Sequence, residues 1–413
     1  MRKRGRSRAA PRVRGRMQMR KPMSANEAGR LAWVVVSGAI GAVLIVTLGA
    51  AAALAAGPRA GAGTVTDYQF ALRGVSVLSA SDAWAVGDGA TVLHWDGASW
   101  APVTIPNLPV GAFLSAVDAL SRSDVWAAGY GFAQGGPETT LIVHWNGTAW
   151  TRVPSPGSFS YPLFPEVDGL SMDSASDGWV VGRVQNNKTG ISKPLTLHWN
   201  GTSWARVTSS AASFFNGVVS VSPTDATAVG ADRAGGVPAA FHWNGSTWTL
   251  AAALPPPPGV PASDLAGPYG LSASSAKNMW TVGGHITSTA GVTNLAWHWN
   301  GTRWTVGSMP LVTDLGSGVI AEAAITPANV WAVGWRNTTN AQATVSAHWN
   351  GTNWTRVATP SPGGTDQTSA LLGVAAAGTQ NIWAVGYYNT LVGIDKVPHT
   401  LILRWNGTRW IRS

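Results

Sequence analysis

The stretch His144-Trp145-Asn146-Gly147-Thr148-Ala149-Trp150 indicates a repeat protein, because seven versions of it occur along the chain. Successive copies lie 50, 54, 44, 56, 50 and 56 residues apart, and each ends on a Trp six residues after its start. A period near 50 is typical of repeat architectures, in which each unit buries its faces against its neighbours. The copies begin at His94, His144, His198, His242, His298, His348 and Arg404.

The earlier half of each unit has its own fixed spacing. An Asp or Asn stands two residues before a Trp, and a Gly follows that Trp by three, as in Asp82, Trp84 and Gly87. Thr227 replaces this Trp in the fourth unit. A small residue stands eight positions before each Asp or Asn, at Gly74, Ala116, Gly169, Gly217, Gly270, Ala321 and Gly373.

These spacings predict four short strands, A to D, in every unit. Strand A should start at the small residue, strand B is the Trp-Ala-Val-Gly run, strand C ends in His-Trp, and strand D begins at the closing Trp. Asn-Gly predicts a tight C–D hairpin with two positive-φ residues. Since four strands cannot bury both faces alone, seven units predict an all-β, seven-bladed β-propeller over residues 65–413.

Packing accounts for most of the repeated residues. Of the 23 Trp residues, 20 occupy repeat positions, and Trp33, Trp297 and Trp335 are the others. Each buried Trp removes roughly 200 Å² from water, so Trp suits the wide gaps between twisted sheets. The small strand-A residues should lie nearest the axis, where the blades crowd together.

The repeat resembles the kelch and galactose-oxidase class of β-propellers. In those families an apolar strand ends in Gly-Gly, and an aromatic residue and a Trp follow at a short fixed spacing. Here Trp-Ala-Val-Gly stands for the first element and His-Trp-Asn-Gly-Thr-x-Trp for the second, while Gly283-Gly284 is the one strand-B diglycine. The resemblance implies the fold and no particular activity. The chain has no Cys, so the Tyr–Cys copper chemistry of galactose oxidase is not carried over.

The N-terminal residues predict membrane attachment. Residues 1–30 hold eleven Lys or Arg against Glu27, and residues 31–56 are uncharged and nearly all apolar. About 20 apolar residues span a bilayer, and positive charge stays on the cytoplasmic side. We therefore expect a cytoplasmic tail (1–30), a transmembrane signal anchor (31–56), a linker (57–64) and an extracytoplasmic propeller. The protein would then reside in the cell membrane as a single-pass protein. A signal peptide cleaved near Ala53-Leu54-Ala55 is the competing interpretation.

No cofactor, metal or nucleic-acid site is predicted. Thiolate ligands are absent, and neither a metalloprotease, a P-loop nor a dinucleotide motif occurs. The six repeated His residues sit in different blades, too far apart to share one ion, so a structural role bonded to a turn residue is expected. The basic charge belongs to the tail, because residues 31–413 sum to −1 against +9 for the whole chain.

Candidate ligand-binding residues lie on the loops whose lengths vary. The strand-B Trp, or Thr227, lies 10 to 21 residues before the strand-C His, or Arg404, whereas the A–B and C–D turns are short and repeated. Binding usually lies on loops held by a rigid scaffold. Polar residues immediately before the small strand-A residue should ring the channel mouth, with carboxylates and loop aromatics nearby. The candidates are Arg73, Asp118, Tyr161, Asp168, Asn216, Tyr269, Glu322, Trp335 and Tyr387.

Two functions fit this composition. The favoured one is a non-catalytic module that binds an extracellular glycan, peptide or protein partner, because no catalytic constellation repeats or clusters. The alternative is an exported hydrolase or lyase that acts on carbohydrate, with Asp168 and either Asp118 or Glu322 as acid and base. Aromatic platforms beside carboxylates, Arg and Asn suit a sugar or a peptide in both cases.

Overall fold

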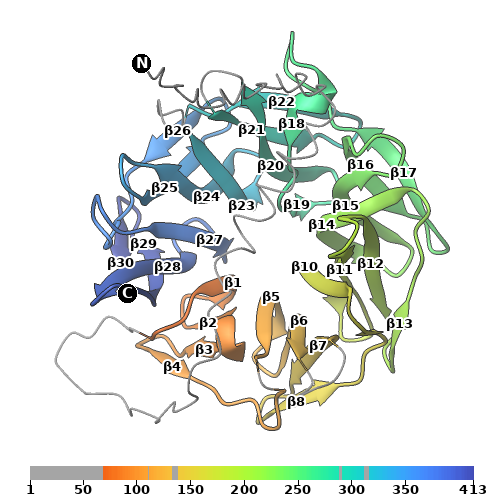
Figure 1. The fold of residues 1–413 in the computed structure, drawn as a ribbon, viewed down its shortest axis with the longest axis horizontal. Coiled ribbons are helices and arrows are strands. Elements are labelled where there is room, and N and C mark those ends of the chain that lie inside the picture. The colour runs from red at the N-terminus through yellow and green to blue at the C-terminus, as the bar shows by residue number, and fades with distance from the viewer. Residues whose placement is uncertain (1–67, 110, 133–137, 288–290, 311–315) are drawn as a thin grey trace, which may run out of the picture. The chain divides into compact units, whose positions relative to one another are not determined.

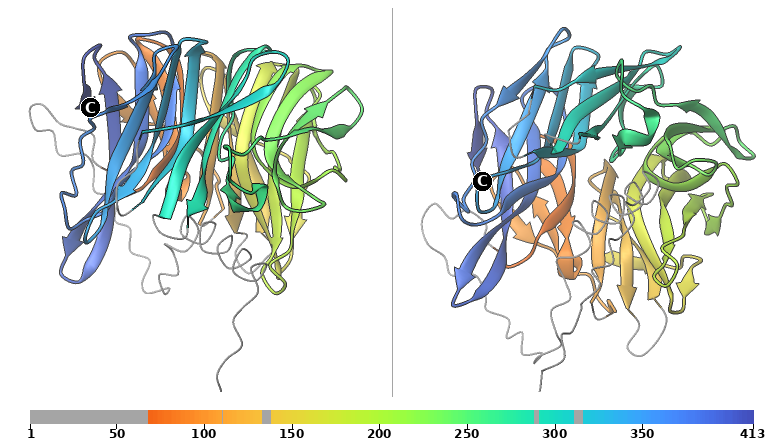
Figure 2. Two further views of the ribbon diagram at one scale, coloured as in Figure 1. Left: turned by 90° about the horizontal axis from the view of Figure 1, so that it is seen from above. Right: turned by 45° about the horizontal axis from the view of Figure 1, so that its top comes forward.

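The computed structural model describes residues 68–413 except 110, 133–137, 288–290 and 311–315. Within these residues seven antiparallel sheets follow one another around a common axis, and each pairs its strands in chain order (Figure 1). The seven-bladed β-propeller is thus confirmed. Figure 2 shows the sheets from the side. Because the strands alternate in direction, the A–B and C–D turns share one end of the blades, and the B–C and D–A connections share the other.

The blades have the following bounds. Blade 1 comprises β1 (Leu72–Ser79), β2 (Asp82–Gly87), β3 (Val92–Trp95) and β4 (Trp100–Pro102). Blade 2 comprises β5 (Phe113–Ser121), β6 (Asp124–Phe132), β7 (Glu138–Trp145) and β8 (Trp150–Val153). Blade 3 comprises β10 (Leu163–Ser174), β11 (Asp177–Asn186), β12 (Ser192–Trp199) and β13 (Trp204–Arg206). Blades 4 and 5 comprise β14 (Ala212–Ser222), β15 (Asp225–Asp232), β16 (Pro238–Trp243) and β17 (Trp248–Ala253); and β18 (Leu265–Ala266), β19 (Ser272–Ser275), β20 (Asn278–Thr287), β21 (Gly291–Trp299) and β22 (Trp304–Ser308). Blades 6 and 7 comprise β23 (Ser317–Thr326), β24 (Asn329–Asn337), β25 (Gln342–Trp349) and β26 (Trp354–Val357); and β27 (Ser369–Ala376), β28 (Ile382–Val392), β29 (Asp395–Trp405) and β30 (Trp410–Arg412). Outside the four-strand pattern lie β9 (Ser158–Phe159), which pairs with β7, and the short helices η1 (Asp88–Ala90) and η2 (Ala262–Asp264).

No strand is exchanged between the first and last blades among the described residues, as β27–β30 form blade 7 alone. Instead the segment before β1 reaches the last blade. The Thr400 amide donates to the carbonyl of Tyr68 at 2.7 Å, and the Tyr68 amide donates to the Thr400 hydroxyl at 3.0 Å. In blade 2 the equivalent Thr140 amide donates to Gly157 of the D–A connection. Tyr68 therefore takes in blade 7 the place that a D–A connection takes elsewhere.

A β-bulge marks strand A, which begins two to six residues before the small residue rather than at it. In six blades the residue before the small one is skipped in the pairing with strand B. The bulge brings a strand-A carbonyl over the strand-B Gly: a Cβ on Gly87 would lie 2.1 Å from the Ala71 oxygen. In blade 5 an irregular segment between β18 and β19 replaces the bulge. The bulge explains why six of the units need this Gly, and in blade 5 the Ala266 carbonyl crowds Gly283 in the same way.

The Trp residues interlock consecutive blades. The strand-B Trp84 stacks on His94 of its own blade at 4.2 Å and meets the strand-D Trp150 of the next blade edge to face at 5.4 Å. Thr227 removes this ring from the contact between blades 4 and 5. There the buried Trp297 of strand C joins the hydrophobic cluster of that contact, together with Val229 of blade 4. Tryptophan packing thus fills the blade contacts, as expected.

The C–D hairpins differ from the expected two-residue turn. Trp145 pairs directly with Trp150, so four residues form the loop. Among the described residues, the Gly of each hairpin has a positive φ and the Asn before it does not. The Asn146 side-chain oxygen instead accepts the backbone amides of Thr148 and Ala149 at 3.0 Å each. The Asn therefore holds the turn through its side chain rather than through a left-handed backbone.

The N-terminal predictions concern residues outside this description. The predicted tail, span and linker all lie within residues 1–67. Across the part of the chain that the structure describes, no helix is long and apolar enough to cross a membrane.

Candidate functional site

Two positions per blade place side chains at the loop end of the inner strands. One is the residue before the small strand-A residue, which in six blades the bulge re-aims out of the regular alternation. The other directly follows the strand-B Gly and lies beside it. We call the interacting polar residues at these positions, with Glu166, the loop-end rim: Arg73, Asp88, Tyr130, Glu166, Asp168, Arg183, Asn216, Tyr269 and Tyr387.

Blade 3 holds the densest part of the rim. Arg183 pairs with Glu166 (Nε to Oε2, 3.1 Å) and with Asp168 (Nη2 to Oδ2, 3.2 Å). Its Nη2 also donates to the Asn216 side-chain oxygen of blade 4 at 2.8 Å, and its guanidinium lies 4.6 Å from the Phe214 ring centroid. Burial raises the pKa of Glu166 and of Asp168, and Arg183 opposes both shifts. One guanidinium therefore organises two carboxylates and an amide.

Asn216 carries the network on to blade 5. It is 7 % exposed, and its side-chain amide donates to the carbonyl of Pro268. The following residue, Tyr269, is half-buried, and its amide donates to the Val282 carbonyl at 2.9 Å. Burial raises the pKa of Tyr269 to about 12, so the phenol stays protonated and can donate a hydrogen bond at neutral pH.

Blade 1 carries a second ion pair of the rim. Arg73 on the bulge of β1 pairs with Asp88, the residue after the strand-B Gly. Burial alone would lower the pKa of Arg73, but the Asp88 carboxylate outweighs it and the net shift is upward. Burial raises the pKa of Tyr387 in blade 7, which interacts electrostatically with both residues. The rim thus continues from blade 1 to the last blade.

Tyr130 of blade 2 lies between the Arg73–Asp88 pair of blade 1 and the Arg183–Glu166 pair of blade 3. Its hydroxyl interacts electrostatically with Arg73 on one side and with Glu166 on the other, and burial raises its pKa to about 12. Its ring stacks on Phe113 at 5.1 Å and meets Phe164 of blade 3 edge to face at 5.1 Å. The rim is therefore continuous from Tyr387 through Arg73, Tyr130 and Arg183 to Tyr269.

The remaining sector is less polar. The bulged residues of blades 6 and 7 are Ile320 and Leu372, where blades 1 to 4 have Arg, Ser, Asp and Asn. Trp335 follows the strand-B Gly of blade 6, and its ring lies against Gly318 of β23, where a Cβ would come within 2.9 Å of it. The apolar bulged residues of blades 6 and 7 thus contrast with the hydrogen-bonding residues at the same position in blades 1 to 4.

Three sequence candidates lie apart from the rim. Asp118 accepts the Met172 amide of the next blade at 2.8 Å, as the hydroxyls of Ser76, Ser171 and Ser272 do in other blades, and burial raises its pKa to about 6. Glu322, 7 % exposed, packs beside Gly270 of blade 5, and burial raises its pKa well above the ordinary range. Tyr161 is 76 % exposed, with Lys188 5.5 Å from its ring centroid.

Sequence reasoning missed three charged residues of the rim: Asp88, Glu166 and Arg183. A signal for two of them was present, because Asp88 and Arg183 directly follow the repeated strand-B Gly, as Trp335 and Tyr387 do. That position gains meaning only with the bulge, which places it beside the skipped residue of strand A. Glu166 lies within β10, upstream of the expected start of strand A.

The repeated His residues are structural, as predicted. Each donates its Nε2–H to the side-chain oxygen of the Asp or Asn at the start of strand B, with Nε2 to Oδ1 distances from 2.7 to 3.1 Å. In the seventh unit Arg404 instead lies 5.2 Å from the Trp383 ring centroid. Throughout the described ranges, no three His, Cys, Asp or Glu side chains gather in a way that could hold a metal ion.

Known proteins resemble this chain in fold. No family model matches it, and no curated protein matches it. A GH74 xyloglucanase from Xanthomonas campestris superposes with a TM-score of 0.51 at 14% identity over 82% of this chain and 55% of the enzyme. A PL25 polysaccharide lyase, an ulvan lyase, gives 0.50 at 9% identity over 81% and 92%. YCF48 bound to a D1 peptide gives 0.49 at 13% identity over 82% and 96%. At such identities the likeness shows the propeller fold alone.

Proposed function

We propose that this chain is a membrane-anchored, extracytoplasmic propeller whose loop-end rim binds a glycan, peptide or protein partner without catalysing a reaction. The observation that carries the proposal is the continuous rim, in which Arg73 and Arg183 are each held by carboxylates of their own blade. Groups fixed in this way offer hydrogen bonds at little cost in ordering, which favours recognition.

The arrangement of carboxylates favours binding over hydrolysis. Acid–base pairs of glycosidases flank the scissile bond, with about 5–10 Å between them. Glu166 and Asp168 do lie near each other, but Arg183 Nε is 3.1 Å from Glu166 and 3.3 Å from Asp168. The guanidinium thus occupies the space where a substrate would sit. Of the other acids considered, Asp118 accepts the Met172 amide of the next blade, and Glu322 is buried against Gly270 of blade 5.

Membrane attachment is part of the same proposal. Its support is the net +10 charge of residues 1–30 followed by the uncharged run 31–56. In this arrangement the propeller lies outside the cytoplasmic membrane and the rim is open to external ligands. The kelch-like character of the repeat is likewise a proposal, supported by its strand-B and hairpin motifs.

A binding screen tests the proposal. The full-length chain is applied to arrays of cell-wall glycans and of extended peptides, and each hit is titrated with the Asn216→Ala and Tyr269→Phe variants. Both changes should weaken binding at least tenfold, because each removes a hydrogen-bonding group of the rim. The matched control is Thr148→Ala on a hairpin at the other end, where blade 1 already has Ala98. If the control weakened binding as much as the rim variants, the assignment of the rim would be wrong.

A further inference from the structure

Two polar residues depart from the repeat at the contact between blades 1 and 2. Asp96 begins the C–D hairpin of blade 1, where the six other blades have Asn. Arg122 lies two residues before strand B of blade 2, where the other blades have Ala80, Ala175, Pro223, Ala276, Pro327 and Thr379. The other blade contacts form without either side chain, so the fold does not require them.

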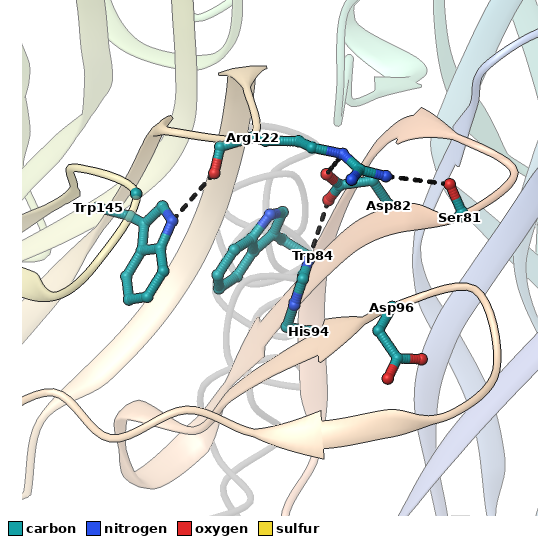
Figure 3. Close-up of a pocket in the computed structure, with 8 residues that line it drawn as sticks. Ser81, Asp82, Trp84, His94, Asp96, Arg122 and Trp145 are labelled. Carbon is teal, nitrogen blue, oxygen red and sulfur yellow. Dashed lines mark hydrogen bonds and ion pairs between the residues drawn. The ribbon is translucent and has the colours of Figure 1, made fainter.

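Both residues line the same hollow, which lies at the turn end of the blades. Its volume is about 200 Å³, and its walls are formed by Ser81, Asp82, Trp84, His94, Asp96, Arg122, Trp145 and Gly147. Figure 3 shows Arg122 reaching over from the neighbouring turn toward Asp82, with Asp96 on the hairpin below. Sites for drug-sized ligands measure roughly 300–1,000 Å³, so this one suits a single small group.

Arg122 is held in position but not covered. Its Nε lies 3.0 Å from Asp82 Oδ2, and its Nη2 donates to the Ser81 hydroxyl at 3.1 Å. Asp82 also contacts His94 Nε2 at 3.0 Å and is 3% exposed. Because 72% of the Arg122 side chain is exposed, its remaining N–H groups face water and can donate to a ligand.

Asp96 changes the chemistry of the hairpin. Its Oδ1 accepts the Ala98 and Ser99 amides at 2.8 and 2.9 Å, as the Asn oxygen does in the other blades. The second carboxylate oxygen replaces the amide nitrogen of Asn, so an acceptor stands where the other hairpins have a donor. The backbone bonds lower the pKa of Asp96, and the group is therefore charged at neutral pH.

Aromatic rings form the rest of the wall. His94 stacks on the buried Trp84 at 4.2 Å, and the half-buried Trp145 lies 5.3 Å from Trp84 across the blade contact. The Trp145 indole N–H donates to the Arg122 carbonyl at 3.1 Å, which fixes the ring. The hollow thus combines an apolar ring face, a cationic donor and an anionic acceptor, which together match a sugar ring with C–H groups on its faces and hydroxyls at its edge.

We propose that this pocket binds one neutral sugar residue of a glycan, with Arg122 donating to its hydroxyls, Asp96 accepting from them and Trp145 contacting its C–H face. A simple ion is disfavoured because Arg122 and Asp96 bring opposite charges to the same small space. The site lies at the opposite end of the strands from the loop-end rim, and it does not depend on the function proposed for the rim.

The test uses substitutions that other blades already contain. The full-length chain is titrated with the methyl glycosides of glucose, galactose, mannose, xylose and N-acetylglucosamine by saturation-transfer NMR and calorimetry. Arg122→Ala and Asp96→Asn restore the residues found at equivalent positions, as in Ala175 and Asn146, so both variants should fold. Each should weaken binding at least tenfold, whereas Leu391→Ala, at an exposed residue that belongs to neither site, should leave it unchanged.

A gain of function completes the test. Ala175→Arg with Asn146→Asp transfers the two polar residues to the contact between blades 2 and 3, where Trp199 takes the place of Trp145. This double variant should bind a second equivalent of the same glycoside. The proposal is overturned if no glycoside binds, if Arg122→Ala and Asp96→Asn bind as the parent does, or if methylammonium displaces the sugar at equal concentration.

Discussion

The indole rings of Trp383 and Trp100 meet edge to face, with centroids 5.1 Å apart and planes at 89°, which joins the last blade to the first. Trp84 of blade 1 and Trp150 of blade 2 meet in the same way, with centroids 5.4 Å apart and planes at 82°. The ring therefore closes through the contact that the repeat uses between all other blades except 4 and 5, where Thr227 replaces the Trp. Closure needs no exchanged strand, and Tyr68 adds a backbone link to blade 7.

Replacing Trp383 by Ala should destabilise the propeller by about 3–5 kcal/mol, as large-to-small substitutions in cores do. The side chain is fully buried, and it contacts both Trp95 and Trp100 across the closure. Urea denaturation of the full-length chain measures the loss. Leu391→Ala, at a residue that is 53% exposed, is the control and should change stability by less than about 0.5 kcal/mol. Equal losses in the two variants would contradict the role of the closure contact.

The contact between blades 4 and 5 should depend on Trp297. Since Thr227 supplies no ring there, Trp297→Leu should lower stability by roughly 2–3 kcal/mol, somewhat less than full truncation to Ala. Leu is the residue at the equivalent positions Leu93, Leu197 and Leu403, so the backbone tolerates it. In the Trp297→Leu variant, hydrogen exchange should show faster opening of β15 and β20, the B strands of blades 4 and 5, than of β6 and β11, the B strands of blades 2 and 3. Unchanged exchange in all four strands would rule out this compensation.

Most of the fold could be predicted from the spacing of a few residues. The number of blades and the strand order follow from the period and from the apolar runs. The structural role of the His was predicted from its recurrence in separate blades, and the hydrogen bond between His144 and Asp124 confirms it. The strand-A bulge could not be predicted, because Gly87 looks the same in sequence whether a carbonyl or a side chain lies over it. The hairpin geometry was missed for a related reason, since Asn146 can act through its backbone or its side chain.

The candidate site was predicted in part. Asp168, Asn216 and Tyr269 were expected together and do connect, but through Arg183, which was not among the predicted residues. Long-range pairings of this kind depend on which side chains the bulges re-aim toward each other. Glu322 was predicted as a binding residue because it is charged, but it is buried. Its burial could have been predicted, because the same position is Val or Leu in every other blade.

Glu322 should make stability depend on pH. Burial raises the pKa of this carboxyl in the folded state above the ordinary value of about 4.3. The folded state therefore holds the proton of Glu322 more tightly than the unfolded state does. The stabilisation of the folded state that results is fully present below about pH 4.3 and is lost as the pH rises through the raised pKa of the folded state. Glu322→Val should raise the melting temperature at pH 8 and leave it nearly unchanged at pH 4. A variant less stable than the parent at pH 8 would show that the carboxylate has a partner.

The N-terminal segment should determine where the protein resides. In bacterial cells that express the full-length chain, the protein should stay in the membrane fraction after carbonate extraction, and external protease should digest the propeller in spheroplasts. Deleting residues 1–56 should release a soluble chain with the same affinity for rim ligands. Retention of a protein lacking residues 1–56 in the carbonate-washed membrane would contradict the anchor, and a shortened mature chain in the medium would favour the cleaved signal peptide.

Measuring binding and turnover on the same sample tests whether the rim binds a ligand without catalysis. The full-length chain is incubated with a glycan or peptide that the arrays identify, and the ligand is quantified by calorimetry and then recovered for mass spectrometry. We predict saturable binding that Asn216→Ala weakens at least tenfold, with the ligand recovered intact after prolonged incubation. Cleavage of the ligand that Asn216→Ala or Asp168→Asn abolishes would contradict a non-catalytic rim and would identify an enzyme instead.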